Sequence, residues 1–266
     1  MSQQDRAAVF RSLHAAGELL RLPNAWDAGS ARLFEACGAR AIATTSAGLA
    51  WSLGYADGNH IPARVLEAAA REISRVTRVP LSVDAEAGLA KDPASVGETV
   101  AAVLGAGAVG VNLEDATDPP DLLCAKIEAA KRAGERLGIA LFVNARTDVY
   151  LKNLASKEHA QAETIARGLA YRAAGADGFF VPGLLRPETI RAVVAAVDLP
   201  LNLMLVPGLP SPRELQALGV RRLSAGSSIA LAAYSLARRE AMQLLGDENA
   251  GGLSALTYPE LNALFR

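Results

Sequence analysis

Short runs of aliphatic and β-branched residues recur along the whole chain. Each is followed by a loop containing Gly, Asp or Pro and then by an Ala-rich stretch. This alternation predicts repeated strand–helix units with parallel strands, and eight such units close a (β/α)₈ barrel. The expected strands are Leu19–Leu22, Ala41–Thr45, Leu81–Asp84, Gly110–Glu114, Ala140–Ala145, Gly178–Val181, Leu201–Leu205 and Arg222–Ala225.

Several of the intervening helices have recognisable starts. Asp92 and Pro93 precede the helical stretch Ala94–Leu104, and Pro187 precedes the stretch Thr189–Val197. Asp is a favoured N-cap residue, and Pro is favoured in the first helical turn. We therefore expect these helices to follow the third and sixth predicted strands.

Beyond the eighth strand, the pattern predicts a long helix over Ser228–Leu245 and a short one over Leu253–Phe265. Both carry more apolar residues than one barrel-covering helix can bury, and an exposed apolar patch of that size usually marks an interface. We expect residues 228–266 to form an oligomerisation segment that docks on a neighbouring subunit. The Gly-rich stretch Gly246–Gly252 is expected to act as a hinge or turn.

Length and composition favour one barrel domain over residues 1–266, because α/β barrels reach about 250 residues as a single unit. The net charge is −1 and the charges are interspersed, so no basic stripe for nucleic acid is present. Two cysteines form neither a disulfide framework nor a zinc pattern. No apolar run resembles a signal peptide or a membrane span, so we expect a cytoplasmic protein without membrane partners.

Acidic residues end or follow several of the apolar runs, at the end of a barrel where active sites lie. Asp84 and Glu86 end the third strand, Glu114 and Asp115 end the fourth, and Asp57 lies in the loop after the second. Carboxylates that converge on one mouth repel one another unless a cation lies among them, and oxygen ligands favour Mg²⁺ or Mn²⁺. Asp84 is the expected direct ligand, whereas Asp115 is better interpreted as a cap of the next helix.

Other polar residues at the predicted barrel mouth suit substrate binding. Arg146 ends the fifth strand, where a guanidinium can bind a carboxylate through two hydrogen bonds or stabilise an enolate. Ser46 and Gly48 follow the second strand, and backbone N–H groups there can hold a substrate carboxylate. Asn202 lies inside a strand and must face a polar interior or find a buried partner.

Seven motifs occur in order: NAWDAGSA, TTSAGLAWSLGYADG, VDAEAG, GVNLEDA, NARTD, GADGFFVPGL and PLN. Over residues 20–230, the chain resembles the isocitrate lyase / phosphoenolpyruvate mutase superfamily. The resemblance implies a barrel whose last helix is exchanged between subunits, in a homodimer or, more usually, a homotetramer. It also implies Mg²⁺ bound with a 2-oxo acid or its enolate.

The matching motifs imply a role for individual residues of this chain. By this resemblance, Asp84 would be the direct metal ligand, and the other acids would hold metal-bound waters. Arg146 would contact substrate oxygens. The implied water-holding acids are Asp57, Glu86 and Glu114, and the implied substrate-carboxylate segment is Ser46, Ala47 and Gly48. The candidate catalytic residues are therefore Arg146, Asp57 and Glu114.

One departure from the superfamily concerns the loop after the fourth strand. The lyases resemble one another there in a Lys-Cys-Gly-His segment whose Cys acts as the acid, whereas this chain has EDATDPPDLLCAKIEAA. Cys124 lies in an apolar helical context and is expected to be a packing residue. Without the acid, we expect C–C cleavage or decarboxylation of a 2-oxo acid such as oxaloacetate, in which a metal makes the oxo group an electron sink.

Other functions remain open on the sequence. A phosphonopyruvate- or phosphoenolpyruvate-processing enzyme of the same superfamily is one, and a non-catalytic 2-oxo acid sensor is another. A Schiff-base aldolase is disfavoured because all five lysines fall in expected loops or helices, and the phosphate-isomerase signal is weak. His14 and His159 are expected to be solvated helix residues, and His60 lies near the barrel entrance.

Overall fold

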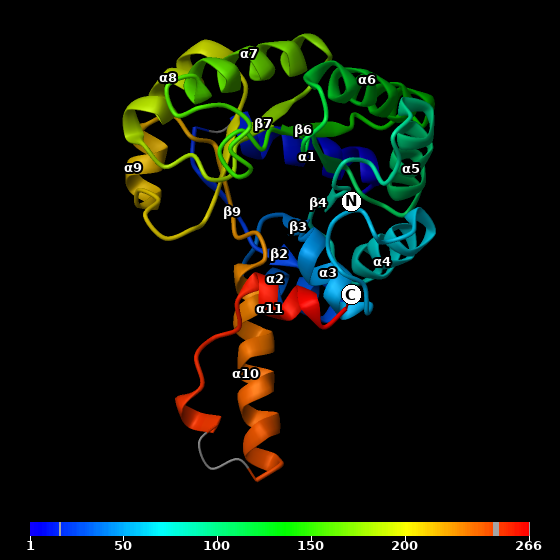
Figure 1. Cartoon of the computed structure of the whole chain (residues 1–266). Coiled ribbons are helices and arrows are strands. Elements are labelled where there is room, and N and C mark those ends of the chain that lie inside the picture. The colour runs from blue at the N-terminus through cyan, green and yellow to red at the C-terminus, as the bar shows by residue number, and fades with distance from the viewer. Residues whose placement is uncertain (16, 247–249, 266) are drawn as a thin grey trace.

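The computed structural model describes residues 1–15, 17–246 and 250–265. A ring of parallel strands is surrounded by helices (Figure 1), which confirms the predicted α/β barrel. Around the described part of the sheet, the strand order is β1-β9-β8-β7-β6-β5-β4-β3-β2. The strands are β1 (Leu20–Leu22), β2 (Asn24–Ala25), β3 (Ile42–Thr44), β4 (Leu81–Asp84), β5 (Gly110–Glu114), β6 (Phe142–Arg146), β7 (Gly178–Phe180), β8 (Leu201–Met204) and β9 (Arg222–Ser224).

The first barrel strand is divided at Pro23. Its first piece, β1, pairs with β9, and its second piece, β2, pairs with β3, so the two pieces lie where the ring closes. Proline has no N–H to donate to a neighbouring strand, which explains the interruption. The sequence pattern predicted only the first piece. The other seven predicted strands agree with the observed ones to within two residues at each end.

Helices lie outside the ring between successive strands (Figure 1). The predicted start of α5 is confirmed, because the Asp92 side chain accepts a hydrogen bond from Ser95 N at 2.9 Å and Pro93 opens the helix. The surrounding helices are α2 (Ala28–Ala36), α3 (Ser46–Ser52), α4 (Ala63–Val76), α5 (Pro93–Gly105), α6 (Pro120–Arg136), α7 (Ala160–Ala173), α8 (Pro187–Val197) and α9 (Pro212–Ala217).

The N-terminal helix α1 (Gln3–Ala15) packs against residues at the amino ends of the strands. Phe10 and His14 both contact Phe142, and the His14 ring stacks on it with 4.2 Å between centroids. His14 is therefore buried, and the expectation that it is solvated was wrong. Burial lowers the pKa of His14 to about 3. The local sequence could not show this, because the barrel that covers His14 is built from distant strands.

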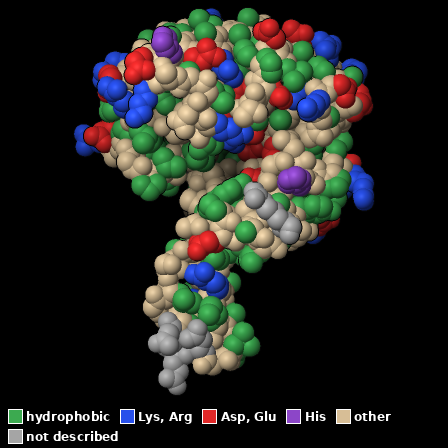
Figure 2. All heavy atoms as spheres, in the orientation of Figure 1, with side chains coloured by type: hydrophobic (Ala, Val, Ile, Leu, Met, Phe, Trp, Pro, Cys, Tyr) green, Lys and Arg blue, Asp and Glu red, His purple; other side chains and the backbone are tan. Residues whose placement is uncertain are grey.

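Helix α10 (Ser228–Leu244) projects away from the barrel (Figure 1). Ala230 is its only buried residue, and Leu236 and Leu244 are exposed. Figure 2 shows further hydrophobic side chains on this arm. The arm has the exposed apolar surface that the sequence led us to expect, and its exchange between subunits stays a prediction. The expected hinge at Gly246–Gly252 lies partly outside the described residues.

After η1 (Ala250–Gly252), the chain returns to the barrel and ends in α11 (Tyr258–Ala263). Leu261 of α11 and Trp51 of α3 are buried in one hydrophobic cluster of this same chain. Helix α11 thus has a buried contact on its own barrel, and the expected docking of residues 228–266 on a neighbouring subunit stays a prediction. None of the described helices is long and apolar enough to cross a membrane.

Candidate active site

A cavity of about 540 Å³ opens at the carboxyl ends of the strands. Asp84 ends β4, Glu114 ends β5 and Arg146 ends β6, and all three line this cavity. Figure 2 shows acidic side chains gathered in the hollow of the body above the arm. The cavity is lined by Asn24, Thr45, Ser46, Ala47, Asp57, Gly58, Asp84, Glu86, Asn112, Glu114, Arg146, Leu151, Lys152, Phe180, Met204, Ser224, Gly226, Ser227 and Tyr258.

The Asp84 carboxylate is fixed through both of its oxygens. Oδ1 accepts a hydrogen bond from Glu86 N at 3.0 Å, and Oδ2 accepts one from Asn112 Nδ2 at 3.1 Å. Its backbone N–H donates to Thr44 Oγ1 at 2.8 Å. Burial raises the pKa of Asp84, so the charged form needs a compensating cation.

A polar layer beneath the cavity orients Asn112. Asn144 Nδ2 and Arg222 NH2 both donate to Asn112 Oδ1, at 2.9 and 3.4 Å. With its oxygen engaged in this way, the Asn112 amide presents its nitrogen to Asp84. Arg222 is fully buried at the start of β9, a position that the sequence pattern did not single out. The signal was available only as a charged residue at the start of a short predicted strand.

Glu86 connects the end of β4 to the loop that carries Asp57. Its Oε2 accepts hydrogen bonds from the backbone N–H groups of Gly58 and Asn59. Glu86 has a φ of 51°, a left-handed conformation that is uncommon for a residue with a side chain and tends to cluster at functional sites. Burial, with Asp57 nearby, raises the pKa of Glu86 to about 8.

Two residues of α11 fix Asp57 from the other side. Tyr258 OH donates to Asp57 Oδ2 at 2.7 Å, and Asp57 N donates to Asn262 Oδ1 at 2.7 Å. The same Asn262 oxygen accepts a hydrogen bond from Trp51 Nε1 at 2.9 Å. Asp57 Oδ1 is buried without a hydrogen-bond partner among the described residues, so it is available to a ligand. Sequence reasoning missed both Tyr258 and Asn262.

Arg146 is held by two carboxylates. NH1 lies 2.8 Å from Glu114 Oε2, Nε donates to Asp148 Oδ1 at 2.7 Å, and the guanidinium lies over the Phe180 ring. Burial opposes the charge of Arg146, but Glu114 and Asp148 outweigh it and raise the pKa of Arg146. Burial raises the pKa of Glu114 to about 7, against the effect of Arg146.

Asp115 does not cap the helix that follows it, which corrects the sequence interpretation. Its buried carboxylate accepts hydrogen bonds from Arg167 NH1 at 2.8 Å, Tyr171 OH at 2.7 Å and the backbone N–H of Asp148 at 2.9 Å. The N-cap residue of α6 is Pro119. Asp115 therefore supports the segment after β6, on which Asp148 lies.

Only some of the predicted substrate-binding residues line the cavity. Ser46 and Ala47 line the cavity, whereas Gly48 and Asn202 are absent from its lining. Gly48 N donates to the N-cap Thr45 at 3.5 Å and packs in the core. Asn202 is fully buried, and its Oδ1 accepts a hydrogen bond from Ser224 Oγ at 3.3 Å. Asn202 thus has a buried hydrogen-bond partner, one of the two outcomes expected from the sequence.

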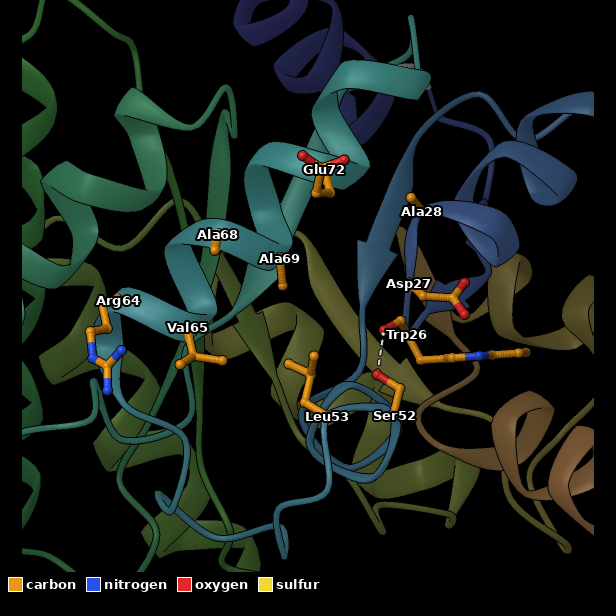
Figure 3. A pocket seen from close by; sticks show the side chains of 10 residues that line it. All are labelled: Trp26, Asp27, Ala28, Ser52, Leu53, Arg64, Val65, Ala68, Ala69 and Glu72. Carbon is orange, nitrogen blue, oxygen red and sulfur yellow. Dashed lines mark hydrogen bonds between the residues drawn. The ribbon is translucent and has the colours of Figure 1, made fainter.

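A second depression lies outside the barrel mouth, between the start of α2, the end of α3 and α4 (Figure 3). Its walls are formed largely by apolar atoms, with Trp26, Leu53 and Val65 among them. The Ser52 hydroxyl there donates to the Trp26 carbonyl at 3.1 Å. Because it contains none of the converging acids, the candidate chemistry belongs to the barrel mouth.

The sequence profile of the phosphoenolpyruvate phosphomutase family matches residues 10–245. The chain belongs to this family. A candidate phosphonomutase from Burkholderia cenocepacia has a solved structure that is 41% identical, with a TM-score of 0.85 over 91% of this chain and 99% of that one. A candidate 2-methylisocitrate lyase of Corynebacterium glutamicum is 31% identical over 74% of this chain and 66% of its own.

Two more distant members of the superfamily bear on the chemistry. An oxaloacetate decarboxylase of Pseudomonas aeruginosa is 28% identical, over 98% of this chain and 91% of its own. The structure of a phosphonopyruvate hydrolase in complex with oxalate and Mg²⁺ is 25% identical, with a TM-score of 0.78, and the match covers 99% of this chain and 95% of that one. The relatives are thus named as lyases, decarboxylases, mutases and hydrolases that act on small carboxylates.

The donor atoms of this family member fit a hard divalent cation. Four carboxylates, those of Asp57, Asp84, Glu86 and Glu114, line the cavity, and the unpartnered Asp57 oxygen is among them. Within the described residues, no three Asp, Glu, His or Cys side chains are grouped tightly enough to hold a metal together. One direct carboxylate with water in the other positions suits this arrangement, and Mg²⁺ usually retains several waters.

Cys124, the residue nearest to the position of the lyase acid in sequence, lies on α6 and outside the cavity lining. It is half-buried and packs against the hydrophobic core, as expected from the sequence. Burial raises the pKa of the Cys124 thiol, with Asp121 and Glu128 acting in the same direction. The thiol is therefore poorly placed to act on a substrate in the cavity.

Proposed function

We propose that this chain is a Mg²⁺- or Mn²⁺-dependent carbon–carbon lyase that acts on a small 2-oxo acid or a related carboxylate through an enolate. The observation that carries the proposal is the convergence of four carboxylates and Arg146 on one cavity at the carboxyl ends of β4 to β6. C–C cleavage and decarboxylation are the favoured reactions, and oxaloacetate is the reference substrate.

The proposed roles follow from the contacts of each side chain. Asp84 would bind the metal directly, while Asp57, Glu86 and Glu114 would hold its waters. A bound divalent cation supplies a Lewis acid that draws electron density toward the 2-oxo group. Arg146 would bind substrate oxygens, because Asp148 and Glu114 hold its guanidinium in place at the cavity wall.

The remaining lining favours a reaction that needs little acid assistance. Ser46 and Ala47 would hold the substrate carboxylate, and the cavity wall continues through apolar side chains such as Phe180 and Met204. Cys124 lies elsewhere, so it does not supply a proton. Loss of carbon dioxide from a 2-oxo dicarboxylate leaves an enolate that water can protonate, which fits a cavity open to solvent.

A phosphonopyruvate-processing activity is the second candidate, and the 41% identical candidate phosphonomutase favours it. Steady-state assays of the Mg²⁺-loaded protein separate the two: with oxaloacetate, pyruvate formation is followed, and with phosphonopyruvate, the formation of phosphoenolpyruvate and of pyruvate with phosphate. Turnover of oxaloacetate at least tenfold above the metal-only rate supports the lyase. If neither substrate turns over while oxalate still binds, the protein is a sensor of 2-oxo acids and the lyase proposal is wrong.

We also propose that the active protein is a homodimer or homotetramer in which α10 is exchanged between subunits. The exposed Leu236 and Leu244 on the projecting helix support this assembly. The intact oligomer would bring the arm of one subunit onto the barrel of another, where its apolar residues would be buried.

A further inference from the structure

Among the described residues that line the cavity, two carry a positively charged side chain, Arg146 and Lys152. Lys152 lies in the turn after β6, and its side chain is 37% exposed. The turn is anchored at its start, since Asp148 N donates to Asp115 Oδ1 at 2.9 Å and Lys152 N donates to the Asp148 carbonyl at 2.8 Å. The ammonium group is thus presented to the cavity from a segment fixed to the end of β6.

The Lys152 ammonium group retains donors for a ligand. Its Nζ lies 3.0 Å from Asp148 Oδ2, but the contact lacks the geometry of a hydrogen bond. Arg146 differs, because its Nε and NH1 are both engaged by carboxylates. An ammonium group carries three N–H donors, and it attracts anions even where one carboxylate is already close.

Asp148 lies between the positively charged side chains of Arg146 and Lys152. Its carboxylate is fully buried and contacts Arg146 through one oxygen and Lys152 through the other. The negative charge between them offsets their repulsion. The cavity therefore has an acidic side, at the ends of β4 and β5, and a cationic side after β6.

A substrate with anionic groups at both ends fits a cavity with these two oppositely charged sides when a metal is bound on the acidic side. Its 2-oxo acid end would bind with the metal on the acidic side, where a second anionic group would be repelled by Glu114 and its neighbours. On the other side, Lys152 offers an exposed positive charge within the cavity.

We infer that Lys152 binds the anionic group at the far end of the substrate, a carboxylate or a phosphonate, and thereby selects 2-oxo acids that carry one. This inference rests on the proposed function, which places the 2-oxo acid end at the carboxylates. Lys152 determines specificity and takes no part in bond cleavage.

The test compares four probes in the Mg²⁺-loaded full-length protein and in Lys152→Met. Oxalate and pyruvate lack a far anionic group, and their binding is measured by calorimetry. Oxaloacetate carries a carboxylate there and phosphonopyruvate a phosphonate, and they are measured by KM or by inhibition constant. Lys157→Met is the matched control, because Lys157 is an exposed lysine in the same segment but outside the cavity lining.

Lys152→Met should weaken the binding of oxaloacetate, of phosphonopyruvate or of both by about 10- to 100-fold, because one charge-assisted contact is lost. Oxalate and pyruvate should change by less than about twofold, which also shows that the variant retains a folded site. Whichever of the two larger probes loses more affinity identifies the far group as a carboxylate or a phosphonate. Lys157→Met should leave all four probes unchanged.

If Lys152→Met weakens the binding of all four probes equally, or changes the binding of none, the inference about Lys152 is overturned. In that case, Mg²⁺-dependent oxalate binding by the unmodified protein would still support the proposed metal site. A covalent adduct at Lys152 after borohydride treatment with pyruvate also overturns the inference, because the lysine would then be a Schiff-base nucleophile. If the unmodified protein fails to bind oxalate with Mg²⁺, the proposed function is wrong and the inference falls with it.

Discussion

Replacing Asn262 by Ala should loosen the loop that carries Asp57, although the two residues lie 205 positions apart in the sequence. The Asn262 side chain is buried, and its Oδ1 accepts hydrogen bonds from Trp51 Nε1 and from the backbone N–H of Asp57. The substitution removes both acceptor contacts at once and leaves a space under α11.

The structure sets the size of the effect. The Trp51 indole N–H lies in a buried contact, and leaving such a donor unpaired costs about 1–3 kcal/mol. The Asp57 N–H is only partly buried and can bind water instead, so its loss adds about 0.5–1.5 kcal/mol. We expect Asn262→Ala to lower the free energy of unfolding by about 1.5–4.5 kcal/mol. It should also weaken Mg²⁺-dependent oxalate binding, because Asp57 is less well placed.

Urea unfolding followed by tryptophan fluorescence measures the first effect, and oxalate calorimetry measures the second. Ala263→Ser is the matched control, because Ala263 is the exposed neighbour on the same helix. It should change neither value appreciably. If Asn262→Ala retains both the stability and the oxalate affinity of the unmodified protein, α11 does not hold Asp57 in place.

Three further predictions concern the thiol, the buried histidine and the arm. Cys124→Ala should keep nearly all activity because the thiol lies outside the cavity; a hundredfold loss in kcat/KM would contradict this. His14 has a pKa of about 3 when folded and about 6.5 when unfolded, so the unfolded chain binds more protons between these values. Stability should therefore fall with decreasing pH across that window, by up to about 1.4 kcal/mol per unit, and an equally steep acid titration of His14→Leu would refute the assignment. Removal of residues 228–266 should give aggregated protein, and light scattering of the full chain should show a dimer or tetramer; a monodisperse full-length monomer at micromolar concentration would exclude that assembly.

The parts of the site that the sequence could predict are those that local pattern encodes. Asp84, Glu114 and Arg146 each end an apolar run, and parallel strands bring such ends to one mouth. The bounds of β4 and β5 agree with the prediction for the same reason, since each strand is a short buried stretch that ends at an acidic residue.

The parts that the sequence could not predict depend on contacts between distant segments. Asn262 contacts Asp57 only because α11 returns to the barrel, and the sequence around Asn262 contains no pattern that predicts this contact. Asp115 follows a strand and precedes a helix, so a cap was the natural interpretation until Arg167 and Tyr171 were seen to bind it. Lys152 lies in a turn, where a lysine is usually solvated.

Calorimetry of oxalate binding, with and without Mg²⁺, in the unmodified protein and in Asp84→Ala tests directly whether Asp84 holds a metal at the barrel mouth. The unmodified protein should bind oxalate only with Mg²⁺, and Asp84→Ala, whose fold is checked by circular dichroism, should lose this binding. Asp92→Ala is the control, because Asp92 caps α5 away from the cavity. Equal Mg²⁺-dependent oxalate affinity in Asp84→Ala and the unmodified protein would contradict the claim that Asp84 holds the metal.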